Sequence, residues 1–262
     1  MSTSPIAQFW RGASRGDWLA AGAILLLALV AWVWLLALPP MDAPMAAGME
    51  AMAGRAPQWT PARALATFAM WTIMMVAMML PSAAPIVLLH RRIGGVDRTA
   101  GAAAPPTAFL LLGYTVAWTG FAALATAGQW ALSRAALLTD ADALADPPIA
   151  AALLIAAGLY QFAPVKQSCL RFCRSPVSFL MRHYRPGAVG ALCMGLVHGT
   201  FCVACCWAAM ALLFVGGVMN LLWIAALSVF VLIEKALPRG DTVGKALGLA
   251  AAAAGAYVLI MR

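Results

Sequence analysis

The stretch GAVGALCMGLVHGTFCVACCWAAMALLF, residues 187–214, contains no Asp, Glu, Lys or Arg and is long enough to cross a bilayer as one helix. Of the 262 residues in the chain, 64% are hydrophobic and 10% are charged, and the mean hydropathy is +0.89. This composition excludes an ordinary soluble domain. We therefore predict an all-α polytopic membrane bundle that forms a single integral membrane domain over residues 1–262.

Further apolar runs bring the predicted number of spans to seven, at about 18–38, 62–89, 107–133, 148–165, 187–214, 218–237 and 242–261. If the N-terminus is cytoplasmic, four of the 17 basic residues lie outside (Arg55, Arg63, Arg134 and Arg262) and 13 lie inside. The positive-inside rule therefore predicts a multi-pass protein of the cytoplasmic membrane with its N-terminus inside. The net charge of +8 then reflects topology and anionic membrane lipids, and we expect no nucleic-acid partner.

A cluster of potential metal ligands lies within the run over 187–214. His198, Cys202 and Cys205 share one stripe of the predicted helix, with Met194 above them and Cys206 beside them. Thiols and an imidazole in an apolar segment suit copper(I). A lone buried Cys is usually a small hydrophobe, but a His with three Cys indicates a metal site. A disulfide within the helix is disfavoured, because residues four positions apart do not bring their sulfurs to bonding distance.

Methionines recur at helical spacing in the second predicted span, at Met70, Met74, Met75, Met78 and Met79. Adaptable packing is the alternative explanation, but Leu packs with better-defined rotamers, so this density of thioethers favours a ligand role. Gly195 and Gly199 allow another helix to approach the fifth span closely, and we predict that the second span does so. Pro81 and Pro85 are expected to kink the second span.

Two more sulfur groups flank the membrane in this topology. An external methionine-rich loop over 39–61 carries Met41, Met45, Met49 and Met52 at helical spacing, which predicts either a copper(I) capture site or an amphipathic segment on the lipid surface. A cytoplasmic Cys- and Arg-rich loop over 165–186 carries Cys169 and Cys173. These two residues are interpreted as a metal exit or sensing pair, with inert thiols or acylation sites as the alternatives.

The chain resembles a family of bacterial integral membrane proteins that are predicted to bind metal and are often labelled copper chaperones. The resemblance covers residues 61–240 and rests on three motifs: Met70-Trp71-x-x-Met74-Met75-x-Ala77-Met78-Met79-x-Pro81, Tyr160-Gln161-Phe-x-Pro164-x-Lys166-x-x-Cys169-x-x-x-Cys173, and Cys202-x-x-Cys205-Cys206-Trp207. It implies metal handling in a bacterial inner membrane without fixing the reaction. The pair Glu234-Lys235 also matches, and we expect its charges to neutralise each other or to anchor the helix at the interface.

No phosphate-binding loop, dinucleotide fingerprint or nucleophile elbow occurs in the sequence, so we do not expect an enzyme. The sequence predicts a copper(I)-binding membrane protein that captures, holds or relays copper, with a periplasmic or membrane protein as donor or acceptor. A thiol redox protein that uses Cys202-x-x-Cys205 and a structural subunit of a membrane complex remain as alternatives.

Overall fold

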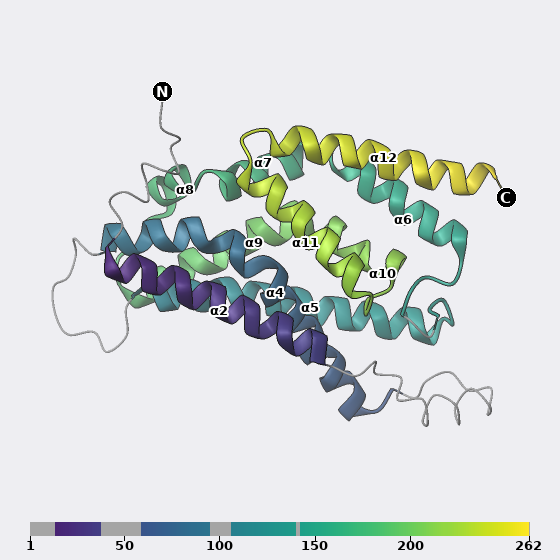
Figure 1. The fold of residues 1–262 in the computed structure, drawn as a ribbon, viewed down its shortest axis with the longest axis horizontal. Coiled ribbons are helices and arrows are strands. Elements are labelled where there is room, and N and C mark those ends of the chain that lie inside the picture. Colours follow the sequence, from purple (N-terminus) through teal and green to yellow (C-terminus); the bar gives the residue numbers. More distant parts are fainter. Residues whose placement is uncertain (1–13, 38–58, 95–105, 140–141, 262) are drawn as a thin grey trace.

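The computed structural model describes residues 14–37, 59–94, 106–139 and 142–261, and within these ranges every regular element is a helix. The long helices are α2 (Arg15–Ala37), α4 (Pro61–Gly94), α5 (Pro106–Arg134), α9 (Gly187–Ala211) and α12 (Gly240–Ile260). The shorter ones are α6 (Pro147–Tyr160), α7 (Pro164–Arg174), α8 (Pro176–His183), α10 (Leu213–Gly216) and α11 (Leu221–Ala236). They form one bundle (Figure 1), which confirms the predicted all-α class.

Five segments are long and apolar enough to cross a membrane: α2, α4, α5, α9 together with α10, and α12. A sixth is added if α6 and α7 form one span that is bent by 63°. Helix α11 has 16 residues, which is shorter than the roughly 20 that a perpendicular span needs. Each of the seven predicted runs contains a helix, but the run over 148–165 is broken between α6 and α7. The number of seven spans and the cytoplasmic N-terminus stay predictions.

Prolines divide the chain between α6 and α9. Pro147, Pro164 and Pro176 occupy the first turn of α6, α7 and α8, where the missing amide hydrogen costs no helical bond. Pro186 then precedes α9 as its N-cap residue. The sequence therefore turns sharply between α6, α7 and α8 and brings α7 against α9. Helix α4, in contrast, continues through Pro81 and Pro85.

The glycines of α9 pack against α5, so the predicted partner of this surface, the second span, is wrong. A Cβ at Gly195 would lie 2.0 Å from the carbonyl oxygen of Leu110, and one at Gly199 would lie 2.6 Å from the Cβ of Ala117. Gly113 of α5 makes the reciprocal approach to the backbone of α9. Small residues on both helices explain this choice, because glycine and alanine let the two backbones come close together. Methionine-lined α4 offers no such surface.

Basic residues gather at one end of the bundle. The start of α2 and the end of α4 lie side by side there, next to α8 (Figure 1). Asp17 of α2 is buried and pairs with Arg91 and Arg92 at 3.4 and 3.2 Å. These ion pairs fix the register of α2 on α4. They also place Arg91 and Arg92 at the end of the bundle where α2 begins.

Candidate metal centre

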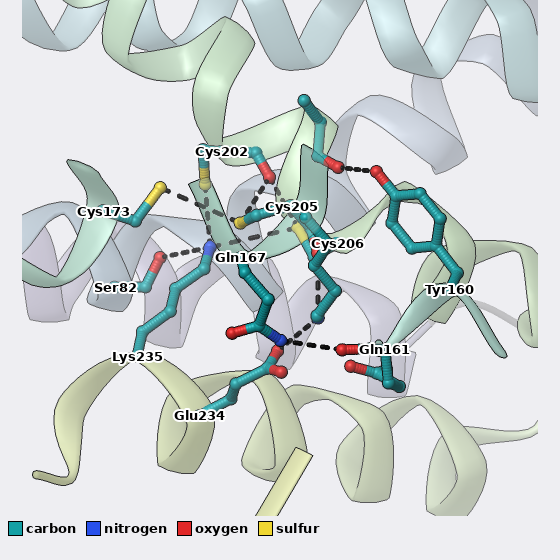
Figure 2. A network of polar contacts seen from close by, with 12 residues as sticks. Ser82, Tyr160, Gln161, Gln167, Cys173, Cys202, Cys205, Cys206, Glu234 and Lys235 are labelled. Atoms are coloured by element: carbon teal, nitrogen blue, oxygen red, sulfur yellow. Dashed lines mark hydrogen bonds and ion pairs between the residues drawn. The ribbon is translucent and has the colours of Figure 1, made fainter. Parts of the chain in front are cut away.

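The ammonium group of Lys235 lies against the thiols of Cys202 and Cys206 and the hydroxyl of Ser82 (Figure 2). Lys235 projects from the last turn of α11, and its Nζ lies 2.8 Å from Cys202 Sγ of α9. Cys206 Sγ and Met79 Sδ each lie 3.9 Å from the same nitrogen, and Ser82 Oγ lies 3.4 Å away. Only 8% of Lys235 is exposed, so these groups stand in for the water that would otherwise solvate its charge.

A second sulfur contact joins α7 to α9. Cys173 Sγ lies 3.8 Å from Cys205 Sγ, although the two residues come from separate helices. We use the term sulfur cluster for Met79, Cys173, Cys202, Cys205 and Cys206, which α4, α7 and α9 contribute. The predicted inner thiol at Cys173 is therefore in direct contact with the predicted intramembrane site.

Helical spacing and a tyrosine orient the thiols of α9. Cys205 Sγ and Cys206 Sγ both donate to the carbonyl oxygen of Cys202, at 3.1 and 2.9 Å, as expected for residues three and four positions further along a helix. The Tyr114 hydroxyl of α5 lies 3.1 Å from Cys202 Sγ and 3.1 Å from the carbonyl oxygen of Met79. Close packing of α5 on α9 thus holds Cys202 from one side while Lys235 contacts it from the other.

Glu234 and Lys235 do not neutralise each other, contrary to the expectation from sequence. Glu234 pairs with Lys166 of α7 at 2.8 Å, and both side chains are 1% exposed. Lys166 also donates to the carbonyl oxygen of Cys205 at 2.9 Å. The charge pair is buried in the protein beside the sulfur cluster, and the expected anchoring of the helix at the interface stays a prediction. Consecutive residues point about 100° apart on a helix, so Glu234 and Lys235 reach different neighbours.

His198 is buried one turn before Cys202 and has no hydrogen-bond partner for its Nδ1 among the described residues. Its ring lies 5.0 Å from the ring of Phe179 and 5.9 Å from the ring of Tyr114, measured between centroids. Tyr114 therefore contacts both His198 and Cys202. The structure brings the imidazole next to the sulfur cluster through this aromatic ring, and its role as a ligand stays a prediction.

Of the second-span methionines, Met79 joins the sulfur cluster. Met70, Met74, Met75 and Met78 are buried in the core, and among the described residues no hydrogen bond links them to the cluster. Met194 Sδ accepts a hydrogen bond from the amide of Arg185 at 3.4 Å, at the start of α9. All five of these methionines lie in the interior of the bundle, and their role as metal ligands stays a prediction.

Cys169 is half-buried and packs against the core one turn before Cys173. The external methionines Met41, Met45, Met49 and Met52 lie outside the described residues. Within the described ranges, no three His, Cys, Asp or Glu side chains are arranged to hold a metal ion together. The donors that converge are thiols and a thioether around an ammonium group.

A family model described as a copper chaperone, PpoB2, matches residues 68–258 of the chain. The chain belongs to this copper chaperone family. The match includes every described residue of the sulfur cluster as well as Lys166, Glu234 and Lys235. No curated protein and no solved structure matches the chain.

Sequence reasoning missed the residues that surround the sulfurs in this copper chaperone family member. Lys235 was visible as a charge within the predicted span over 218–237, and such residues are costly enough in a membrane to mark a site, whereas Lys166 fell in the predicted cytoplasmic loop. Tyr114 and Ser82 gave no comparable signal, because hydroxyls are common in membrane helices. Their role depends on the contacts between different helices, and the spacing of residues within one helix does not predict those contacts.

Proposed function

We propose that the protein binds copper(I) as cargo within a bacterial inner membrane, at the sulfur cluster, and passes it to an acceptor. One observation carries the proposal: Cys202, Cys206 and Met79 already surround a single positive charge, the Lys235 ammonium. Copper(I) carries the same charge and prefers soft sulfur donors. It can therefore take the place of the ammonium without changing the charge that the sulfurs enclose.

The charge balance of the core favours a monovalent cargo. Lys166 is neutralised by Glu234, whereas Lys235 has no carboxylate partner among the described residues. Copper(I) binding would release the thiol protons of Cys202 and Cys206 to solvent. Copper(I) with the two thiolates then has a net charge of −1, which the +1 charge of Lys235 offsets. A neutral assembly is the least costly one in a low-dielectric interior. Ser82 Oγ, 3.4 Å from Nζ, offers the displaced ammonium an acceptor.

Copper would leave through the second sulfur contact. Cys205 follows Cys202 by one helical turn, and its sulfur lies 3.8 Å from that of Cys173 on half-buried α7. Copper(I) moves between thiolates by ligand exchange, which makes and breaks only metal–sulfur bonds and so requires no enzyme activity. We propose Cys173 and Cys169 as the exit to a cytoplasmic acceptor, and the external methionines Met41, Met45 and Met49 as the entry from a periplasmic or membrane donor.

The first experiment measures copper(I) stoichiometry and affinity on detergent-purified protein under anaerobic conditions. We compare the wild type with Cys202→Ser/Cys206→Ser, and with Cys193→Ser as the matched control. Cys193 lies on the same helix and forms no hydrogen bond among the described residues. The double variant should lose one copper equivalent while the control binds normally. If a folded double variant retains full stoichiometry and affinity, the sulfur cluster is not the copper site.

A thiol redox protein is the second candidate, because Cys173 and Cys205 hold their sulfurs 3.8 Å apart on different helices. A small movement would bring them to the bonding distance of about 2 Å. In forming the disulfide, the two thiols would give two electrons and two protons to a disulfide of a partner protein. The sequence-based redox pair, Cys202 with Cys205, is replaced here by a pair between helices. Thiol counting on the same samples decides: a reversible Cys173–Cys205 disulfide in protein that binds no copper favours this candidate.

A further inference from the structure

A cavity of about 610 Å³ is lined by side chains of α7 and α8 and of Ser175 between them. Its lining contains three arginines and three serines, and no carboxylate among the described residues. We call it the basic cavity, and its lining consists of Ser168, Arg171, Phe172, Arg174, Ser175, Ser178 and Arg182. Residues 147–233 contain no Asp or Glu at all, so the sequence provides no acidic side chain from either helix.

Two of the three guanidinium groups form no ion pair with an acidic side chain of the described ranges. Arg174 is engaged, since it donates to Asp241 at 2.8 Å and to the carbonyl oxygens of Leu237 and Pro238. Arg182 lies 5.9 Å above the ring of Phe172, and Arg171 forms no ion pair among the described residues. The basic cavity therefore presents about two uncompensated positive charges in a planar geometry that suits phosphate oxygens.

The start of α8 adds a further attraction for an anion. Ser175 is the N-cap residue of α8, but its side chain does not cap the helix. Pro176 has no amide hydrogen and the Phe179 amide donates to the Ser175 carbonyl oxygen, so the amides of Val177 and Ser178 are the free donors at the positive end of the helix dipole. Ser178 Oγ donates to the Ser175 carbonyl oxygen at 3.0 Å, which holds that hydroxyl at the cavity wall.

Apolar side chains flank the basic cavity and indicate the source of the anion. Val177 and Met181 are 56% and 82% exposed and lie one helical turn apart on α8. Ser178 and Arg182 follow them by one position each, so α8 has an apolar stripe next to a polar, basic stripe. Such a helix lies in the membrane interface, with acyl chains along one stripe and headgroups along the other.

We infer that the basic cavity binds the phosphate group of an anionic phospholipid, with its acyl chains along Val177 and Met181. The arginines and the start of α8 would hold the phosphate, while the serine hydroxyls would recognise a polar headgroup such as glycerol. This site is independent of copper binding. It would fix α7, and therefore Cys173, at a defined depth in the bilayer.

The test is native mass spectrometry of detergent-purified protein mixed with phosphatidylglycerol or with phosphatidylcholine of the same chains. Arg171→Gln/Arg182→Gln is the test variant, and Arg134→Gln, at the end of α5, is the matched control. We expect the wild type and the control to retain one tightly bound phosphatidylglycerol, and the test variant to bind it roughly 30-fold more weakly. Phosphatidylcholine binding should be weak and equal in all three proteins.

Two additional arms keep the result decisive. Arg171→Lys/Arg182→Lys retains the charge but loses the planar fork, so it should bind phosphatidylglycerol with intermediate affinity if the arginines contact the phosphate. Inorganic phosphate at millimolar concentration should not displace the lipid. Unchanged phosphatidylglycerol binding in a folded glutamine variant would overturn the proposal, and displacement by phosphate alone would assign the cavity to a free anion instead of a lipid.

Discussion

Replacement of Lys235 by Met should relax the choice between copper(I) and zinc(II). The methionine fills a similar volume and adds a thioether, but it removes the positive charge beside Cys202. In the wild type, the positive charge of Lys235 repels a divalent ion at the sulfur cluster twice as strongly as it repels copper(I), because the divalent ion carries one more unit of charge. The variant should therefore gain zinc affinity relative to copper affinity.

The distances in the sulfur cluster set the size of this effect. Nζ of Lys235 lies 3.9 Å from Cys206 Sγ and from Met79 Sδ, which approximates its distance from a bound ion. Two unit charges about 4 Å apart interact by about 4 kcal/mol at an effective dielectric constant of about 20. Even if the flexible ammonium withdraws to about 8 Å from the ion, the interaction is still about 2 kcal/mol. The affinity ratio of copper(I) to zinc(II) should therefore fall roughly 30-fold in Lys235→Met.

The assay is competition against chelators of known affinity, for each metal separately, on anaerobic purified protein. Lys235→Arg keeps the charge and should keep the selectivity, and Lys245→Met on α12 controls for loss of a lysine elsewhere. Circular dichroism confirms that each variant is folded. An unchanged affinity ratio in folded Lys235→Met would refute the argument from charge, even if the protein binds copper(I).

The remaining predictions concern stability in detergent. Gly195→Ala should lower the stability by about 1–3 kcal/mol, because its Cβ would lie 2.0 Å from the Leu110 carbonyl oxygen, whereas Gly120→Ala on α5 has nothing within 4 Å and should be neutral or mildly stabilising. Equal melting temperatures for these two variants would contradict the close contact of α5 with α9. Glu234→Gln should cost about 3–5 kcal/mol, because it leaves the Lys166 ammonium buried without its carboxylate, and Lys166→Met/Glu234→Leu should recover much of that loss. If the double variant is no more stable than Glu234→Gln in chemical unfolding, the two side chains are not an isolated ion pair.

Sequence periodicity predicted the helices well, because apolar runs bounded by proline and charge leave few alternatives in a membrane. The run over 187–214 folds as α9 and α10, and the predicted stripe of His198, Cys202 and Cys205 is buried along one helix. The membrane class followed from composition alone. The partners of each helix were less predictable. Gly195 and Gly199 predicted a close helix contact but not that α5 makes it, because the matching small residue, Gly113, lies on the other helix.

The centre of the sulfur cluster illustrates what one-dimensional spacing leaves out. Cys173 was assigned to a separate exit on the grounds of topology, but the sharp turns at Pro164 and Pro176 fold α7 back against α9 and place its thiol beside Cys205. Tertiary packing thus merged two sites that lie 32 residues apart in the sequence. The methionines of α4, in contrast, were predicted as one group but are separated in the structure. Met79 belongs to the sulfur cluster, whereas Met70, Met74, Met75 and Met78 pack in the core.

The adjacent charges of α11 show why the site needs the fold to be understood. From the sequence we expected Glu234 and Lys235 to neutralise each other or to anchor the helix at the interface. In the bundle, Lys166 takes the carboxylate and Lys235 is left without an acidic partner among the described residues. A buried ammonium is tolerated only where other groups offset its charge, and here those groups are sulfur atoms and hydroxyls. If the sulfur cluster binds copper(I) as proposed, the charge of Lys235 favours a monovalent ion over a divalent one.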